Sequence, residues 1–252
     1  MLKLEHFARI RKPLRQDDLE QLGISTERLI IEAIDAGDTE RAKALVRYVL
    51  DERKPLHDMQ CDTYWDFLTR IGAAMGEAAV GQILRDSALD GLKRTWKAFL
   101  KMTVLERVQM CAQMMRSHAF SAEADGSGVT VVEDEEKYTL SMNPCGSGGR
   151  MRRGDPASGT PSRLGPPYNF AVAERAYDWT WNTPGVPYYC GHCAINEILP
   201  MDWGGHPLWV TAFDTDASKP CAWLFYKKAV AIPLRFYERV GRSKPPAGEG
   251  QY

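Results

Sequence analysis

The sequence predicts an α+β fold: an N-terminal helical bundle packed on a small antiparallel sheet, with a long Gly/Pro-rich loop within the sheet-forming half. Three observations support it. One proline, Pro55, stands between Asp17 and Phe120, where apolar residues recur at helical spacing. After residue 125 the apolar period becomes that of strands. We therefore expect a helical region (1–125) and an α+β, cysteine-containing region (126–252) that together form one compact unit.

Helix signals are clearest in the first half. Ser25 or Thr26 is a suitable N-cap for a helix over 27–36, which Gly37 would end, and Asp38 can cap a helix that starts at Thr39. Pro55 should kink or restart this second helix because it has no amide hydrogen. Periodic apolar residues predict three further helices, over 60–72, 77–89 and 104–120.

Two strand pairs follow. Residues 129–133 and 137–142 are rich in Val, Thr and Tyr and flank an acidic turn, which is typical of a hairpin. Residues 208–213 and 221–226 form a second pair, joined by a polar connection that ends in Pro220. The sequence therefore predicts a small antiparallel sheet against which the helices pack.

The segment 143–187 contains seven glycines and seven prolines in 45 residues, and it predicts a long loop. Such a loop is uncommon in a compact domain unless it is functional, disordered or held by something other than a hydrophobic core. Cys145 opens the loop, and Cys190 and Cys193 follow it closely. Cysteine spacing of this kind is typical of a metal clamp.

Zn²⁺ prefers four nitrogen or sulfur ligands in a tetrahedron, and a Cys-x-x-Cys pair brings two sulfurs to one ion. We expect Cys145, Cys190 and Cys193 to be three ligands. The fourth is left open among His192, Cys221, His206, His118 and water. Four protein ligands would make the site structural, whereas three and an open position would make it a Lewis acid. Four thiolates, from Cys145, Cys190, Cys193 and Cys221, would equally suit iron or an iron–sulfur cluster.

Beside Cys145 lies a Gly- and Arg-rich stretch that contains Arg150, Arg152 and Arg153. Glycine-rich backbone can point several amides into one concavity, and guanidinium groups match the geometry of carboxylates and phosphates. The stretch predicts binding of a small anionic organic molecule. Nucleic acid is excluded because the cluster is short and the formal net charge of the chain is −1.

Further polar residues are candidates for catalysis. Glu197 follows Cys193 by four residues and could act as a general acid/base toward a metal-activated water, and His57 beside Asp58 could do the same. Tyr188 and Tyr189 belong to a strongly aromatic C-terminal half that could wall a pocket for a flat ligand. A helical stripe is better interpreted as core; it consists of Cys111, Met114, Met115 and His118.

Cys190-Gly191-His192-Cys193 resembles the redox motif of the protein disulfide isomerase family, which implies thiol–disulfide exchange. That family would place a parallel strand before the motif and a long helix after it. Here Pro187 precedes the motif and Pro200 follows within seven residues of Cys193, which favours metal binding over redox chemistry.

Three longer stretches carry a second resemblance: NPCGSGGR from Asn143, PYYCGHC from Pro187 and PCAW from Pro220. With KPLHD from Lys54, they resemble a family of uncharacterised bacterial proteins over most of the chain. The helical first half and cysteine-bearing second half are also similar to the L-2-amino-thiazoline-4-carboxylic acid hydrolase family. The latter resemblance implies hydrolysis of a small molecule.

The sequence thus predicts a metal-dependent enzyme, with zinc as the first candidate, that acts as a hydrolase or lyase on a small carboxylate-bearing substrate. The alternatives are a non-catalytic binding protein with a structural zinc site, and an iron, iron–sulfur or thiol redox protein. The N-terminus has no signal-peptide pattern and no apolar run approaches the ~20 residues of a membrane span, so we expect a cytoplasmic protein without membrane contact. A homo-oligomer is left open.

Overall fold

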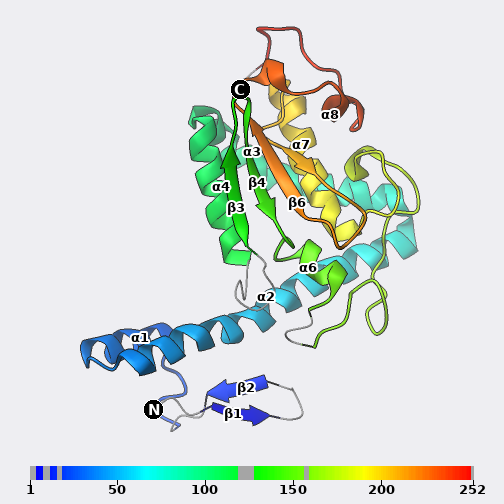
Figure 1. The fold of residues 1–252 in the computed structure, drawn as a ribbon. Helices are drawn as coiled ribbons and strands as arrows, with labels where there is room; N and C mark the ends of the chain where they lie inside the picture. The colour runs from blue at the N-terminus through cyan, green and yellow to red at the C-terminus, as the bar shows by residue number, and fades with distance from the viewer. Residues whose placement is uncertain (1–3, 8–11, 16–18, 119–127, 156–158, 251–252) are drawn as a thin grey trace. The chain divides into compact units, whose positions relative to one another are not determined.

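The computed structural model describes residues 4–7, 12–15, 19–118, 128–155 and 159–250 (Figure 1). The predicted α+β fold is confirmed, with several helices and a four-stranded antiparallel sheet. The chain divides into two compact units, Met1–Met59 and Gln60–Tyr252. The composition change predicted near residue 125 lies inside the second unit, between its helices and its sheet.

The first unit contains a two-stranded antiparallel sheet that the sequence did not predict, β1 (Leu4–Phe7) and β2 (Lys12–Arg15). It also contains α1 (Thr26–Asp35) and the first part of α2 (Thr39–Met75). The capping predictions are confirmed here. The side chain of Ser25 accepts a hydrogen bond from the amide of Arg28, and the carboxylate of Asp38 accepts one from Arg41.

The second helix continues through Pro55. The helix predicted to begin at residue 60 is therefore the C-terminal part of α2. A proline inside a helix removes one amide hydrogen bond. A side-chain contact also joins the residues on either side of the proline: Lys54 Nζ donates to the carboxylate of Asp58 at 3.1 Å.

The helices of the second unit are confirmed with different bounds. Helix α3 (Glu77–Lys101) is twelve residues longer than predicted and continues through Gly91. Helix α4 (Val104–His118) begins where predicted. The last two residues of that predicted helix lie outside the described residues.

The sheet of the second unit has the strand order β3-β4-β6-β5, antiparallel throughout. Strands β3 (Val129–Glu133) and β4 (Lys137–Met142) form the predicted hairpin, and β6 (Cys221–Tyr226) has the predicted bounds. Its partner β5 (Val210–Ala212) is shorter than the predicted 208–213.

One face of this sheet packs against α4 and the end of α3. In the register of β4 and β6, Leu140 lies opposite Trp223, and Met142 lies opposite Cys221. These pairs belong to one apolar cluster that we call the filled core. Its buried members are Phe99, Val108, Cys111, Ala112, Met115, Leu140, Met142, Leu208, Trp209, Trp223 and Phe225.

The predicted loop 143–187 has more structure than expected. It contains the short helix α6 (Gly148–Arg153) and the 3₁₀ turn η2 (Asp178–Thr180). The turn η3 (Tyr188–Cys190) then leads into α7 (Gly191–Gly204), which runs through Pro200. The expectation that this proline would prevent a long helix after the cysteine motif was wrong.

The last described segment adds the turn η4 (Ala229–Ala231) and the short helix α8 (Arg235–Glu238). Helix α7 packs against α3 and η2, so the segment with the Cys-x-x-Cys motif lies in the middle of the second unit. Among the described residues, no helix has the length and apolar character needed to cross a membrane.

Candidate functional site

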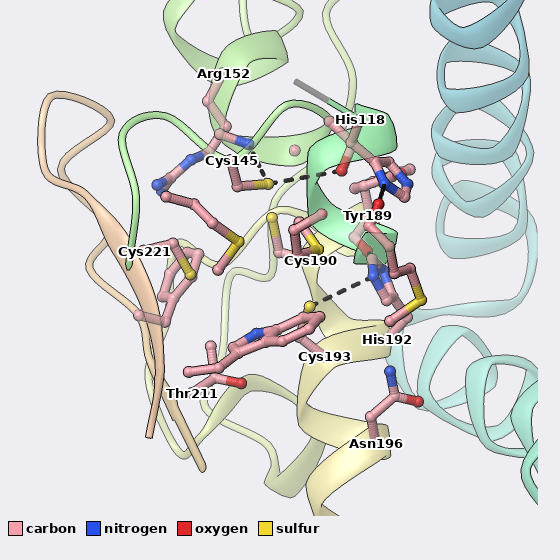
Figure 2. A pocket seen from close by; sticks show the side chains of 18 of the residues that line it. His118, Cys145, Arg152, Tyr189, Cys190, His192, Cys193, Asn196, Thr211 and Cys221 are labelled. Atoms are coloured by element: carbon pink, nitrogen blue, oxygen red, sulfur yellow. Dashed lines mark hydrogen bonds between the residues drawn. The ribbon is translucent and has the colours of Figure 1, made fainter. Parts of the chain in front are cut away.

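A cavity of about 190 Å³ lies inside the second unit, between α4, α6, α7 and the ends of β4, β5 and β6 (Figure 2). Its wall is mostly apolar and rich in sulfur. The lining residues are Met114, Met115, His118, Met142, Cys145, Ser147, Gly148, Gly149, Arg152, Trp181, Tyr189, Cys190, His192, Cys193, Asn196, Thr211, Phe213, Cys221 and Trp223.

Four cysteines from separate places in the sequence line this cavity. Cys145 follows β4, Cys190 and Cys193 stand at the start of α7, and Cys221 begins β6. All four are free thiols, as are the other two cysteines of the chain, which do not line the cavity. The sequence-predicted cysteine ligands are therefore brought to one place.

Glycines in α6 allow this approach. A Cβ atom added to Gly148 would lie 2.8 Å from Cys190 Sγ, which is closer than real Cβ atoms come to other heavy atoms. The next residue, Gly149, donates its amide to Cys145 Sγ at 3.4 Å. The GG pair thus positions one cysteine through a hydrogen bond and leaves space for another.

Burial determines the protonation of the thiols. It raises the pKa of Cys190 to about 12 and the pKa values of Cys193 and Cys221 above their usual range. The neighbouring cysteines raise the pKa of Cys221 further, and the positive charge of Arg152 opposes the shift at Cys190 and Cys221. The thiols of Cys190, Cys193 and Cys221 therefore keep their protons at neutral pH, and binding of a cation by these sulfurs would release the protons.

His192 lies against Cys193. Its Nδ1 bonds the carbonyl oxygen of Tyr189, and its Nε2 lies 3.4 Å from Cys193 Sγ. Burial lowers the pKa of His192, so the ring is neutral. Because a carbonyl can only accept, Nδ1 carries the hydrogen and Nε2 is left to accept from the thiol.

As arranged here, the predicted ligands surround the cavity and do not converge on one point. Among the residues that the structure describes, no group of three or more His, Cys, Asp or Glu side chains is placed to hold a metal ion. His118 also lines the cavity, with its Nδ1 bonding the carbonyl of Met114 at 2.7 Å. His206 is elsewhere, between the hydroxyl of Tyr237 and the carbonyl of Glu249.

Of the three predicted anion-binding arginines, Arg152 alone lines the cavity. Arg150 is buried and pairs with Asp155, at 3.3 Å. Arg153 donates to the backbone carbonyls of the turn 217–219 and to the side chain of Asn143. Both hold the local fold in place.

The two predicted tyrosines differ in the same way. Tyr189 lines the cavity, and its hydroxyl lies 3.3 Å from Cys61 Sγ. Tyr188 does not line it. Its hydroxyl donates to the carboxylate of Glu77 at 3.1 Å, and its ring lies against Gly72.

Glu197, predicted as a general acid/base, is not among the lining residues. It is fully buried and forms an ion pair with Arg239 at 2.7 Å. It also accepts hydrogen bonds from Trp181 Nε1 and from the amide of Thr211, two residues of the cavity wall. Burial raises the pKa of this carboxyl, and the ion pair with Arg239 and both hydrogen bonds oppose the shift. Glu197 thus braces the wall from behind.

His57 and Asp58 belong to the first unit. The imidazole Nδ1 lies 3.3 Å from the carboxylate of Asp58, which also accepts from Lys54. Neither residue is among those that line the cavity. The structure therefore brings together the predicted metal ligands and one predicted arginine, without the predicted acid/base groups.

The cavity includes residues that sequence reasoning assigned to other roles or missed. Met114, Met115 and His118 come from the helical stripe interpreted as core; Cys111 of that stripe is core, whereas the other three reach the cavity. Their spacing was the available signal, but spacing does not tell a filled face from an open one. Thr211 and Phe213 of the strand segment 208–213 gave no signal of their own.

Comparisons of this chain with protein-family models, with curated proteins and with solved structures found no match. The resemblances described above stay predictions, and the function is argued from the cavity itself.

Proposed function

We propose that the second unit is a metal-dependent enzyme that binds its metal through the cavity cysteines and acts on a small carboxylate-bearing molecule. One observation carries the proposal: four free thiols from separate segments line a single buried cavity that also contains a charged arginine. Thiolate sulfur is the ligand that zinc and iron–sulfur centres prefer.

Zinc is the first candidate. Cys145, Cys190 and Cys193 are its proposed ligands, and a fourth position left to water makes the site catalytic. Cys221 or His192 in that position would make it structural. Convergence of the sulfurs requires rotation about the single χ1 angle of each cysteine and loss of the thiol protons. When bound with an open position, zinc supplies Lewis-acid chemistry and an activated water.

The chain contributes the remaining chemistry. Arg152 would orient the carboxylate of the substrate and offset its charge. His118 and His192 are the cavity imidazoles that could take a proton during the reaction, and we transfer to them the role predicted for Glu197. The apolar wall would limit the access of bulk water.

An iron–sulfur cluster is a second candidate. A cluster spreads its four thiolates over several iron atoms, so cysteines that surround a cavity suit it better than they suit a single ion.

Thiol redox chemistry has less support. Burial raises the pKa of both cysteines of the CGHC motif, although they stand at the start of α7. A redox-active cysteine of this kind has a lowered pKa. The segment before the motif is the turn η3 and not a strand.

The test is the metal content of protein purified without oxygen, for the wild type, Cys145→Ser and Cys111→Ser. Cys111 is a matched control because it is buried in the filled core. We expect about one equivalent of zinc, or several of iron with strong visible absorption, in the wild type and control, and less than about a tenth of that in Cys145→Ser. Wild-type protein without any transition metal would contradict the proposal.

Catalysis needs its own measurement. Loaded and metal-free protein are incubated with a panel of carboxylate-bearing amides and esters, and products are followed by NMR. Turnover by the loaded protein alone supports an enzyme. A loaded protein that turns over none of them would favour a structural metal site instead.

A further inference from the structure

The hydrogen bonds of Arg152 leave one edge of its guanidinium group unused. Nη1 donates to the carbonyls of Asp214, at 2.8 Å, and Thr215, at 3.3 Å. Nε is buried and has no hydrogen-bond partner among the described residues. The described residues provide no bond to Nη2 either. The Nε–Nη2 edge is the fork with which arginine binds a carboxylate through two hydrogen bonds.

Arg152 is only 4 % exposed and forms no direct ion pair with a carboxylate in the described part of the chain, and its charge is felt by the exposed Asp216. Comparable arginines are paired. Arg150 faces Asp155, Arg163 faces Asp62 and Arg239 faces Glu197. A buried guanidinium without a directly paired carboxylate is unfavourable, so Arg152 can accept an anionic ligand at its unused edge.

Aromatic rings extend from this group along the cavity wall. The guanidinium of Arg152 lies 4.7 Å from the ring centre of Phe213. Phe213 stacks on Trp181 with centres 4.9 Å apart and an interplanar angle of 22°. Figure 2 shows Arg152 on the side of the cavity where Cys145 and Cys221 lie. A ligand held by Arg152 would therefore meet both thiols and aromatic rings.

Two more donors in the wall lack partners. The hydroxyl of Thr211 and Nε1 of Trp223 are buried without a hydrogen bond to any described residue. The two residues stand opposite each other in the register of β5 and β6. They could bind a second polar atom of the ligand, such as a ring oxygen or nitrogen.

We propose that the cavity binds a planar aromatic carboxylate, whose two oxygens accept hydrogen bonds from the Nε–Nη2 edge of Arg152 and whose ring lies along Phe213 and Trp181. A cavity of ~150 Å³ accommodates benzene, so one of about 190 Å³ has room for a single ring with a carboxylate. This deepens the proposed function by naming its substrate class, but the contact with the anion needs no metal.

The test uses benzoate as the probe and the full chain with its metal content measured beforehand. Benzamide has the same shape without the charge, and acetate has the charge without the ring. Calorimetry and thermal unfolding are recorded for the wild type, Arg152→Met and Arg152→Lys. Arg153→Met is the matched control, because Arg153 is in the same helix and bonds only outside the cavity.

We expect benzoate to bind the wild type and the control, and to bind Arg152→Met at least about tenfold more weakly, since a charged hydrogen-bonded contact is lost. Arg152→Lys keeps the charge without the fork and should also bind more weakly. Benzamide and acetate should each bind at least about tenfold more weakly than benzoate. Benzoate should raise the unfolding temperature of the wild type but not that of Arg152→Met.

Equal binding of benzoate and benzamide, or unchanged binding of benzoate by Arg152→Met, would overturn the inference. If Arg152→Met does not fold, binding of benzoate by Arg152→Lys as tightly as by the wild type would overturn it. Benzoate bound through Arg152 by protein without metal would sustain this inference while the metal proposal fails. Metal-loaded protein without benzoate binding would do the reverse.

Discussion

The filled core and the cavity are neighbours built from the same elements, yet one is closed and the other open. Helix α4 and strands β4 and β6 contribute to both, and Met115, Met142 and Trp223 are common to the two. In the filled core, large apolar side chains such as Leu140 and Phe225 fill the space between helix and sheet. At the cavity, the side chains of cysteines and glycines are too small to fill the corresponding space.

Helix α4 thus contributes Cys111 to the filled core alone, Met114 and His118 to the cavity alone, and Met115 to both. The cavity places thiols and an arginine with an unused hydrogen-bonding edge where apolar side chains would pack better. Polar groups left without partners in a protein interior are unfavourable unless they bind something. The filled core provides the rigid support for this arrangement.

Metal removal should have the largest effect, and it should destabilise the cavity segments more than the filled core. Stripping the metal with a strong chelator under reducing conditions should lower the free energy of unfolding by several kcal/mol, because binding of a structural zinc contributes of order 10 kcal/mol in small zinc domains. Hydrogen exchange should accelerate in 143–155 and 188–193, and stay slow in α4, β4 and β6. Equal acceleration of hydrogen exchange in both regions would contradict the expectation that the metal stabilises the cavity segments alone.

Substitution of Glu197 should destabilise the cavity wall formed by Trp181 and Thr211. Glu197→Gln cannot form the ion pair with Arg239, so we expect the free energy of unfolding to fall by about 1–3 kcal/mol. Denaturant unfolding measures this. The metal content should not change, because the cavity cysteines are intact. A variant of unchanged stability whose turnover falls a hundredfold would instead identify Glu197 as the general acid/base predicted from the sequence.

A pair of glycine substitutions gives the smallest effect and the sharpest contrast. Gly91→Ala in α3 meets open space and should stabilise the protein by about 0.5–1 kcal/mol, because alanine favours a helix. Gly148→Ala would place a methyl group 2.8 Å from Cys190 Sγ, so it should displace that cysteine and lower the metal content. Thermal unfolding and metal analysis of both variants check this. Full metal binding by Gly148→Ala would show that Cys190 is not a ligand.

Local patterns predicted much of the fold. The hairpin of β3 and β4 and the bounds of β6 follow from alternation and turn residues, and the caps at Ser25 and Asp38 from side-chain chemistry. Helix α6 could not be predicted, because its first two residues are glycines and its contacts with the turn 217–219 are distant in sequence. Tertiary contacts override propensity there.

For the site, cysteine spacing predicted which residues meet, since Cys145, Cys190, Cys193 and Cys221 all reach one cavity. It could not predict which arginine faces inward. Arg150 and Arg152 are two residues apart in one helical turn, so they point to different sides, and the choice depends on the position of Asp155. Two partners of Glu197 likewise come from later segments: Thr211 lies in β5, and Arg239 directly follows α8.

The proposal that the cavity cysteines bind a metal is best tested by X-ray absorption spectroscopy at the metal edge, because this method reports the atoms that contact the metal in the intact protein. The proposal predicts three or four sulfur atoms bonded to the metal at about 2.3 Å, and one sulfur fewer in Cys145→Ser. A shell of oxygen and nitrogen alone in the wild type would contradict it.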